Sequence, residues 1–283
     1  MIRRTLSILL LLTLLPLVPA GAEGGETAGF TVQGITLERD GKALYGELYL
    51  PEKEGPLPLV ILCHGFGGNR THMAVYARLF ARNGIAAFAF DFIGGGLVSR
   101  SDGTMKEMSV LTEAADLDVV MDRMIELPEI DGNHIFLMGA SQGGFVCSYT
   151  AGKRPGDVAG LIALFPAYVL QDNAWAQTPD PDNIPETISL MGLTLGRIYN
   201  ADAMSFDIYE VIANYPGKVL ILHGTKDFVV PISYSERAAE IFPDAELVRY
   251  EGAGHGFQGR DETDAEERSL AFVQQILGAK EAE

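Results

Sequence analysis

Two patterns of apolar and polar residues divide the chain. Over residues 30–38 and 43–50 the two kinds of residue alternate on either side of the turn Asp40-Gly41, which predicts an antiparallel hairpin. From residue 57 onward, continuous apolar runs of strand length alternate with longer segments of helical period. Such runs are typical of strands buried on both faces of a parallel sheet. We therefore expect a doubly wound α/β sheet with an antiparallel start.

The expected elements follow one another in regular order. Strands are predicted at residues 57–63, 86–90, 134–138, 160–165, 219–222 and 246–250. Helices are predicted at residues 71–83, 109–127, 142–153, 233–242 and 261–277. We find no internal repeat and no second domain.

Residues 166–216 break that order. The segment holds aromatic and aliphatic residues and a proline-rich stretch at 178–185, but no clear core strand. It is far longer than the usual connection of about 4 to 6 residues. We expect it to be a lid inserted over the carboxyl edge of the sheet, where ligands bind in such folds. A loose surface loop is the alternative, which the apolar content disfavours.

The N-terminus has the layout of a signal peptide. Arg3 and Arg4 precede an apolar run at 6–18, and small residues follow at 20–22. The run is shorter than the about 20 residues that cross a bilayer as a helix. We expect residues 1–22 to be removed, leaving one α/β domain at 23–283 in a secreted or periplasmic protein. Retention of the leader as a membrane anchor is the alternative.

Composition excludes several classes of protein. The formal net charge of −17 repels nucleic acid and anionic membranes and favours a neutral small-molecule ester as the partner. Two cysteines, Cys63 and Cys147, are too few for a disulfide-built fold, and we expect both to be free and buried. The chain has no metal-binding spacing of histidine and cysteine, and no cofactor is indicated.

Ser141 is the candidate nucleophile. The motif Gly139-Ala140-Ser141-Gln142-Gly143 lies between a predicted strand and a predicted helix. That context is typical of a nucleophile elbow, in which flanking glycines permit the tight turn that exposes the serine oxygen. A motif of this form also occurs by chance, so the context carries the prediction.

His255 and Asp227 are the candidate base and acid. A serine hydroxyl is a weak nucleophile at neutral pH and needs a base. His255 follows the last predicted strand on a glycine-rich loop, and Asp227 follows the strand before it. The order Ser, Asp, His is that of α/β hydrolases. The carboxylate would hold the imidazole in the correct tautomer.

Two backbone amides are candidates for the oxyanion hole, which needs donors aimed at the developing charge. One belongs to Gln142, directly after the nucleophile. The other belongs to Phe66, in the turn His64-Gly65-Phe66-Gly67-Gly68-Asn69 after the strand at 57–63. No phosphate-binding or dinucleotide motif accompanies that turn.

These motifs resemble the bacterial cinnamoyl and feruloyl esterases of the α/β-hydrolase superfamily. The resemblance runs from the turn at 64–69 to the end of the catalytic motifs. The motifs that carry it are Ser101-Asp102-Gly103, the elbow extended by Gly144, Ile184-Pro185, Ile208-Tyr209-Glu210, His223-Gly224-Thr225-Lys226-Asp227 and Gly254-His255-Gly256-Phe257. It implies an α/β-hydrolase fold and hydrolysis of esters between a hydroxycinnamic acid and an alcohol.

The resemblance also implies substrate contacts from the lid. By similarity of position, Asp172, Tyr199 and Gln177 would line an aromatic acyl pocket. Two departures weaken the substrate assignment more than the mechanism: Ala140 stands where many relatives have histidine, and the turn at 93–99 differs from the usual pattern.

Other readings remain open at this stage. A serine peptidase, a lipase-like enzyme or a thioester hydrolase would share the fold and the triad. A non-catalytic binding protein on the same fold would be expected to lack Ser141, His255 or Asp227.

Overall fold

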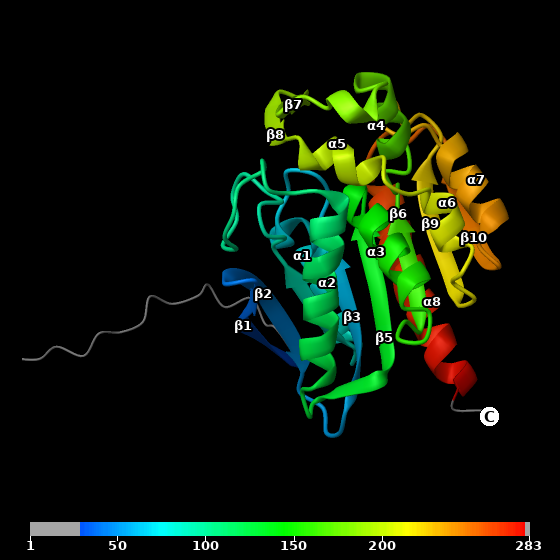
Figure 1. Ribbon diagram of the computed structural model, residues 1–283. Helices are drawn as coiled ribbons and strands as arrows, with labels where there is room; N and C mark the ends of the chain where they lie inside the picture. Colours follow the sequence, from blue (N-terminus) through cyan, green and yellow to red (C-terminus); the bar gives the residue numbers. More distant parts are fainter. Residues whose placement is uncertain (1–28, 281–283) are drawn as a thin grey trace, which may run out of the picture.

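A single eight-stranded sheet forms the centre of the molecule. The computed structural model describes residues 29–280. Figure 1 shows the sheet with helices on both sides. Its strands are β1 (Phe30–Arg39), β2 (Lys42–Pro51), β3 (Leu57–Cys63), β4 (Ala86–Phe90), β5 (Ile130–Ala140), β6 (Gly160–Leu164), β9 (Lys218–Gly224) and β10 (Asp244–Tyr250). Their spatial order is β1-β2-β4-β3-β5-β6-β9-β10.

Strand directions confirm the predicted architecture. β2 pairs antiparallel with β1 and with β4, whereas the remaining neighbours pair in parallel. The antiparallel start is the hairpin whose alternation was visible in the sequence. Every predicted strand and helix is present, with ends shifted by a few residues, as expected for frayed termini.

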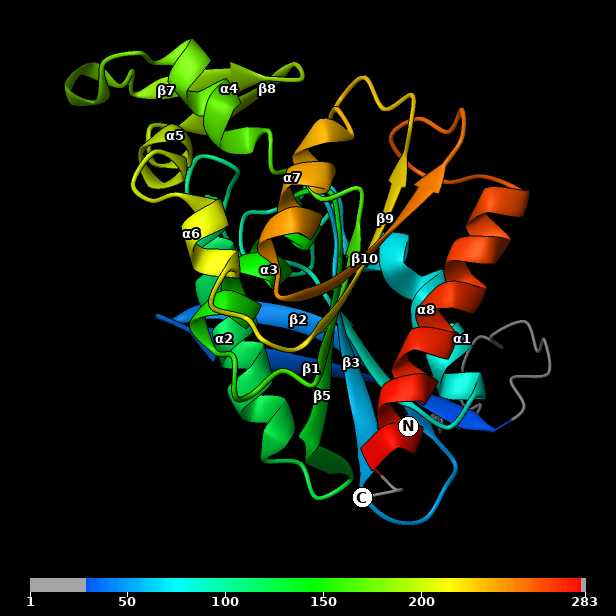
Figure 2. The same ribbon diagram turned by 90° about the vertical axis from the view of Figure 1, so that its right-hand side faces the viewer.

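Helices cover the two faces of the sheet with separate apolar cores. These helices are α1 (Ala74–Arg82), α2 (Val110–Ile125), α3 (Gln142–Lys153), α7 (Ser233–Ile241) and α8 (Arg260–Lys280), and a short 3₁₀ helix, η1 (Arg70–Met73), precedes α1. Figure 2 shows α1 and α8 on one face and α2, α3 and α7 on the other. In β3, Val60 and Leu62 join the core of the α1 and α8 face, whereas Leu59 and Ile61 join the opposite core. The continuous apolar runs therefore reflect burial on both faces.

The segment between β6 and β9 builds its own small structure. It contains α4 (Leu170–Gln177), η2 (Pro181–Asn183), the hairpin β7 (Thr187–Leu190) and β8 (Leu193–Gly196), α5 (Ile198–Ala203) and α6 (Ile208–Ile212). In Figure 1, α4, β7, β8 and α5 lie beyond the carboxyl ends of the parallel strands. α6 instead packs beside α3 and α7. The covering part of the lid segment (residues 166–216) is therefore α4 through α5.

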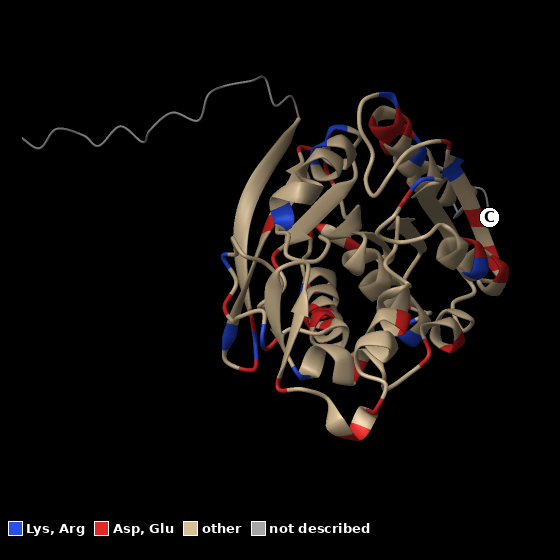
Figure 3. Cartoon of the chain, turned by 90° about the horizontal axis from the view of Figure 1, so that it is seen from above, with Lys and Arg blue, Asp and Glu red and all other residues tan. Residues whose placement is uncertain are grey.

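The remaining sequence expectations concern the leader, membrane spans, metal ligands, the two cysteines and surface charge. The predicted leader at 1–22 lies outside the described residues. Within residues 29–280, no helix has the length and hydropathy to cross a bilayer, and no cluster of His, Cys, Asp and Glu could hold a metal ion. Cys63 and Cys147 are free and buried. Seen from above in Figure 3, acidic residues are spread over many elements.

Candidate active site

Ser141 lies in a strained turn between β5 and α3. Its φ is 53° and its ψ is −117°, a conformation that a residue with a side chain rarely adopts. The turn is possible because glycines surround it: a Cβ at Gly139 would lie 2.2 Å from the carbonyl oxygen of Gly143. A Cβ at Gly143 would lie 2.4 Å from the carbonyl oxygen of Cys63. The strain and the close packing are those of a nucleophile elbow.

The structure brings Ser141, His255 and Asp227 together, although they are far apart in the sequence. Nε2 of His255 lies 3.0 Å from Oγ of Ser141. Nδ1 of the same ring lies 2.7 Å from Oδ2 of Asp227. Because an ionised carboxylate only accepts hydrogen bonds, Nδ1 carries the proton and Nε2 is free to accept from the serine hydroxyl. This is the hydrogen-bonding order that a serine nucleophile requires.

Asp227 is almost fully enclosed, at 6% exposed, yet its carboxylate is held by several donors. Oδ1 accepts from the backbone amides of Val229 and Val230, and Oδ2 also accepts from Nε2 of His223 at 3.1 Å. Burial opposes ionisation, but the hydrogen bonds from His223, His255 and Val230 outweigh it and hold the pKa of Asp227 well below its usual range. The group is therefore a carboxylate at neutral pH.

The two candidate oxyanion donors flank Ser141. Gln142 is the first residue of α3, so its N–H has no partner within the helix. Phe66 follows Gly65 in a turn closed by a 3.0 Å hydrogen bond from the amide of Gly68 to the carbonyl oxygen of Gly65. The second position of such a turn does not use its own amide in that bond. The turn bond and the helix bonds leave both amides unused, so both remain candidate oxyanion donors.

His64 braces the turn that carries Phe66. Its Nδ1 lies 2.8 Å from the carbonyl oxygen of Gly65, and its Nε2 accepts from the amide of Phe92 at 3.2 Å. Burial lowers the pKa of His64 to about 4, against the opposing effect of the Gly65 bond. The ring is neutral at pH 7. The turn at 93–99 contributes a second brace, because Gly96 forms a β-bridge with Gly67.

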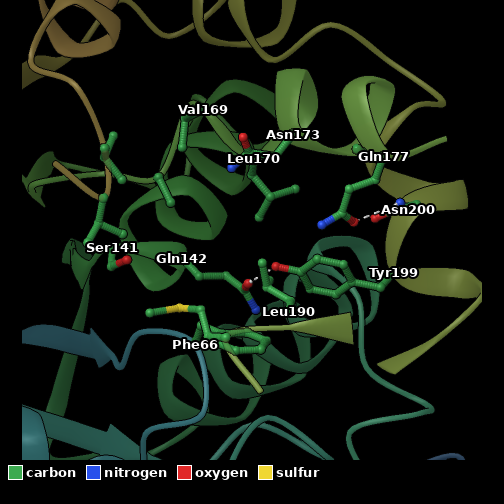
Figure 4. A pocket seen from close by; sticks show the side chains of 15 residues that line it. Phe66, Ser141, Gln142, Val169, Leu170, Asn173, Gln177, Leu190, Tyr199 and Asn200 are labelled. Carbon is green, nitrogen blue, oxygen red and sulfur yellow. Dashed lines mark hydrogen bonds between the residues drawn. The ribbon is translucent and has the colours of Figure 1, made fainter. Parts of the chain in front are cut away.

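A cavity of about 550 Å³, counting the part open to solvent, extends from Ser141 beneath α4. Most of its lining residues are apolar, and Figure 4 shows Gln177, Asn200 and Tyr199 at the end away from Ser141. The side chains that set its character are Phe66, Leu170, Asn173, Gln177, Leu190 and Tyr199. The cavity is therefore largely apolar, with Gln142 and Asn173 as polar residues along its walls and Gln177 and Asn200 at its far end.

A second cavity of about 1010 Å³, counting the part open to solvent, also borders Ser141. It shares Ser141 and Phe66 with the first but is also lined by His255. Aromatic side chains of Tyr76 and Phe257 form part of its wall. The serine thus borders two spaces, of which only the second contacts the imidazole.

The structure separates the three lid residues singled out from the sequence. Tyr199 and Gln177 line the first cavity. Asp172 is exposed and accepts a 2.6 Å hydrogen bond from the hydroxyl of Tyr234 instead. Its neighbour Asn173 lines the cavity, as does Asn200, and sequence reasoning missed both.

A helical period at α4 could have identified Asn173. Leu170, Asn173, Ala174 and Gln177 all line the first cavity, and they recur at the spacing of one helix face. Asp172 is off that face. Glu113 was also missed: it is buried in α2 and accepts a 2.8 Å hydrogen bond from the Gln142 side chain.

Comparison with known proteins places this geometry among hydrolases. A family model described as serine aminopeptidase, S33, matches residues 54–200, and one described as TAP-like protein matches residues 208–275. The chain is 26% identical to the monoglyceride lipase of Saccharomyces cerevisiae over 80% of this chain and 87% of that one. It is 29% identical to the acetyl esterase Axe7A of Xylanibacter ruminicola over 67% of this chain and 47% of that one.

The fold has solved counterparts. A structure of Est1E from Butyrivibrio proteoclasticus with bound ferulic acid superposes with a TM-score of 0.79, at 25% identity, over 86% of this chain and 99% of that one. This similarity confirms the α/β-hydrolase fold predicted from the sequence.

Proposed function

The chain belongs to the serine aminopeptidase S33 family of α/β hydrolases, and we propose that it is a serine carboxylic-ester hydrolase that cleaves hydroxycinnamate esters. The observation that carries the proposal is the unbroken hydrogen-bonded series Ser141, His255, Asp227 at the mouth of a largely apolar cavity with amide side chains at its far end. Esterase and lipase relatives support the reaction class.

The geometry accounts for each step of the reaction. His255 takes the proton of Ser141 as the serine oxygen attacks the ester carbonyl, and Asp227 stabilises the imidazolium that forms. The amides of Phe66 and Gln142 hold the oxyanion, where each donor is worth about 3 kcal/mol. The imidazolium then protonates the leaving alcohol. Water, activated by the same base, releases the acid from Ser141.

The position of His255 supports a different role for each of the two cavities. The imidazolium must reach the oxygen of the leaving alcohol to protonate it. His255 lines only the larger cavity, so the alcohol leaves on that side. The cavity beneath α4 then receives the acyl group. The reaction requires no cofactor.

The acyl cavity suits an aromatic acid with a polar ring substituent. Phe66, Leu170 and Leu190 offer apolar surface on which a planar cinnamoyl group can pack. At the far end, Oε1 of Gln177 is near Nδ2 of Asn200, at 3.4 Å, so the Gln177 amide group remains available as a donor. A phenolic hydroxyl would find its partner there. Bound ferulic acid in Est1E supports this choice of acid.

Alternative substrates differ in what they require of the same site. A lipase-like enzyme would need an apolar acyl cavity without the amides of Gln177 and Asn200. A peptidase would need a group that holds a charged amino terminus near the cavity. A thioester hydrolase would place the same requirements on the site, so only an assay with a thioester substrate distinguishes it from an ester hydrolase. A non-catalytic binding protein is disfavoured by the hydrogen bonds that join Ser141, His255 and Asp227.

We propose further that residues 1–22 are a cleaved signal peptide and that residues 23–283 are exported as one domain with the lid segment at 166–216. The basic residues before the apolar run support this. The net charge of −17 supports an uncharged small-molecule ester as the partner, rather than nucleic acid or an anionic membrane.

Steady-state hydrolysis of methyl ferulate and p-nitrophenyl butyrate by the wild type and Ser141→Ala tests the proposal. We expect turnover of both esters, with the higher kcat/KM for the ferulate, and loss of both in the variant. Turnover of the butyrate alone would reject the hydroxycinnamate assignment. Preference for monoolein or for an aminoacyl anilide would favour the lipase or peptidase alternative.

A further inference from the structure

A buried carboxyl group that the proposed reaction does not use lies beside the oxyanion donors. Glu113 of α2 is 1% exposed. Its Oε2 accepts a 2.8 Å hydrogen bond from the side-chain nitrogen of Gln142. The carbonyl oxygen of that same side chain accepts a 2.8 Å hydrogen bond from the hydroxyl of Tyr199. Three side chains thus form one hydrogen-bonded chain from α2 through α3 to α5.

The Gln142 side chain is held at both ends. Its amide nitrogen also approaches the sulfur of Met108 at 3.3 Å, and the whole residue is 1% exposed. An unpaired amide at this depth would cost about 1 to 3 kcal/mol. Since the backbone N–H of Gln142 is the proposed oxyanion donor, anchoring the side chain restrains the backbone that carries that N–H.

A second contact ties the same helix to the lid. Ser109 caps the N-terminus of α2, and its hydroxyl donates to the carboxylate of Asp202 in α5. Tyr199 lies in the same short helix and lines the acyl cavity. The first turn of α2 therefore contacts α5 both directly and through Gln142.

We propose that Glu113 is a positioning residue. Through the Gln142 side chain it keeps the backbone N–H of Gln142 directed at the oxyanion and holds Tyr199 against the acyl cavity. The inference rests on the proposed function only in taking Gln142 as the oxyanion donor. It does not depend on the identity of the acid. Glu113 touches neither the substrate nor Ser141, and it acts through the Gln142 side chain.

A neutral carboxyl suits this role. A negative charge beside a developing oxyanion would raise the energy of the transition state, because the low dielectric of a buried site strengthens repulsion. Burial raises the pKa of Glu113 well above its usual range, the hydrogen bond from Gln142 opposes this rise, and nearby Asp116 adds to it. The raised pKa favours the uncharged form of Glu113, which accepts from Gln142 through its carbonyl oxygen without adding charge near the reaction.

Two substitutions at Glu113 distinguish the effect of side-chain length from the effect of the acidic group. Glu113→Gln keeps the length of the side chain and an oxygen that can accept from Gln142, but cannot ionise. Glu113→Asp keeps the acid but is one methylene too short. We expect Glu113→Asp to lower kcat about ten- to a hundredfold on p-nitrophenyl acetate and on methyl ferulate, since misplacing a catalytic group by about 1 Å can cost about a hundredfold. We expect Glu113→Gln to restore most of that loss.

The two esters separate positioning from general loss of structure. The acetyl group is too small to reach Tyr199, so on the acetate we expect a fall in kcat with little change in KM. On methyl ferulate we expect KM to rise as well, because Tyr199 is no longer held. If Glu113→Gln is as damaged as Glu113→Asp, the acid itself matters and the inference is wrong. Wild-type kinetics in Glu113→Asp would also overturn it.

Tyr199→Phe provides a test that does not alter Glu113, should Glu113→Asp fail to fold. It removes the hydroxyl that holds Gln142 and leaves the ring. We expect a lower kcat on p-nitrophenyl acetate, although the acetyl group does not touch residue 199. An unchanged kcat on the acetate would overturn the inference. The kcat on p-nitrophenyl acetate depends on the Gln142 oxyanion donor and not on the acyl cavity. Failure to hydrolyse methyl ferulate would therefore reject the hydroxycinnamate assignment without affecting the test of Glu113.

Discussion

The carboxylate of Asp227 lies 2.7 Å from Nδ1 of His255, and both of its oxygens are occupied by donors. The backbone amides of Val229 and Val230 hold one oxygen, and His223 and His255 share the other. The carboxylate therefore has one orientation, and it sets the tautomer of the imidazole that faces Ser141.

Asp227→Asn should preserve the shape of the site and lose the reaction. The amide nitrogen of an asparagine would face Nδ1 of His255 and favour the wrong tautomer, so we expect kcat to fall about 10⁴-fold. Steady-state kinetics on p-nitrophenyl butyrate measure this. Asp244→Asn, at an exposed surface ion pair with Lys218, is the matched control and should retain full activity. Substantial kcat in Asp227→Asn would contradict the assignment of the acid.

Gly143→Ala should disturb the elbow itself. The added Cβ would lie 2.4 Å and 2.5 Å from the carbonyl oxygens of Cys63 and His64, so the turn must shift. We expect a loss of about 1 to 3 kcal/mol in the free energy of unfolding, together with a lower kcat. Gly156→Ala is the control, since nothing lies within 4 Å of its Cβ. Equal stability of the two variants in urea unfolding would show that the elbow is looser than described.

Gln177→Leu should weaken binding of acids with a phenolic hydroxyl. One neutral hydrogen bond is worth about 0.5 to 1.5 kcal/mol, so we expect KM for methyl ferulate to rise about three- to tenfold. Methyl cinnamate has no hydroxyl on its ring and should show an unchanged KM. A similar change for both esters would indicate that Gln177 acts through packing and would not support the proposed polar end of the acyl cavity.

His64 should make the fold sensitive to mild acid. Its pKa falls from 6.5 to about 4 on burial. Between these two pH values His64 is protonated in the unfolded chain but stays neutral in the folded chain. The stabilisation is complete above pH 6.5 and is lost as the pH falls toward 4. At 1.36 kcal/mol per pKa unit the loss is about 3 kcal/mol.

Urea unfolding at several pH values measures this effect. His64→Asn lacks the titrating ring, so its free energy of unfolding should fall less between pH 6.5 and 4 than that of the wild type. Its stability at pH 7 is expected to be lower, because the brace to Phe92 is lost. If the free energy of unfolding falls equally with pH in the two proteins, the proposed lowering of the His64 pKa is contradicted.

Most of the fold, and the positions of the candidate catalytic residues along the chain, were predictable from the local pattern of apolar residues and glycines. Continuous apolar runs identified the buried strands, and glycines around Ser141 identified the turn. The lid was harder, because its short elements bury few residues and give weak periodicity. Asp172 was chosen over Asn173 because residues 170–177 were not recognised as a helix, and the helical period is what places Asn173 on the face toward the cavity. Glu113 was missed because a carboxyl in an amphipathic helix is normally solvated, and only packing shows that it is buried.

Covalent labelling with a fluorophosphonate tests the central claim most directly. The reagent phosphonylates a serine only when that serine is activated by a base and the oxyanion donors are in place. Peptide mass spectrometry of the labelled protein should find one adduct, on the peptide that contains Ser141, and Ser141→Ala should remain unlabelled. An adduct on a different residue, or ester turnover without any adduct at Ser141, would contradict the account.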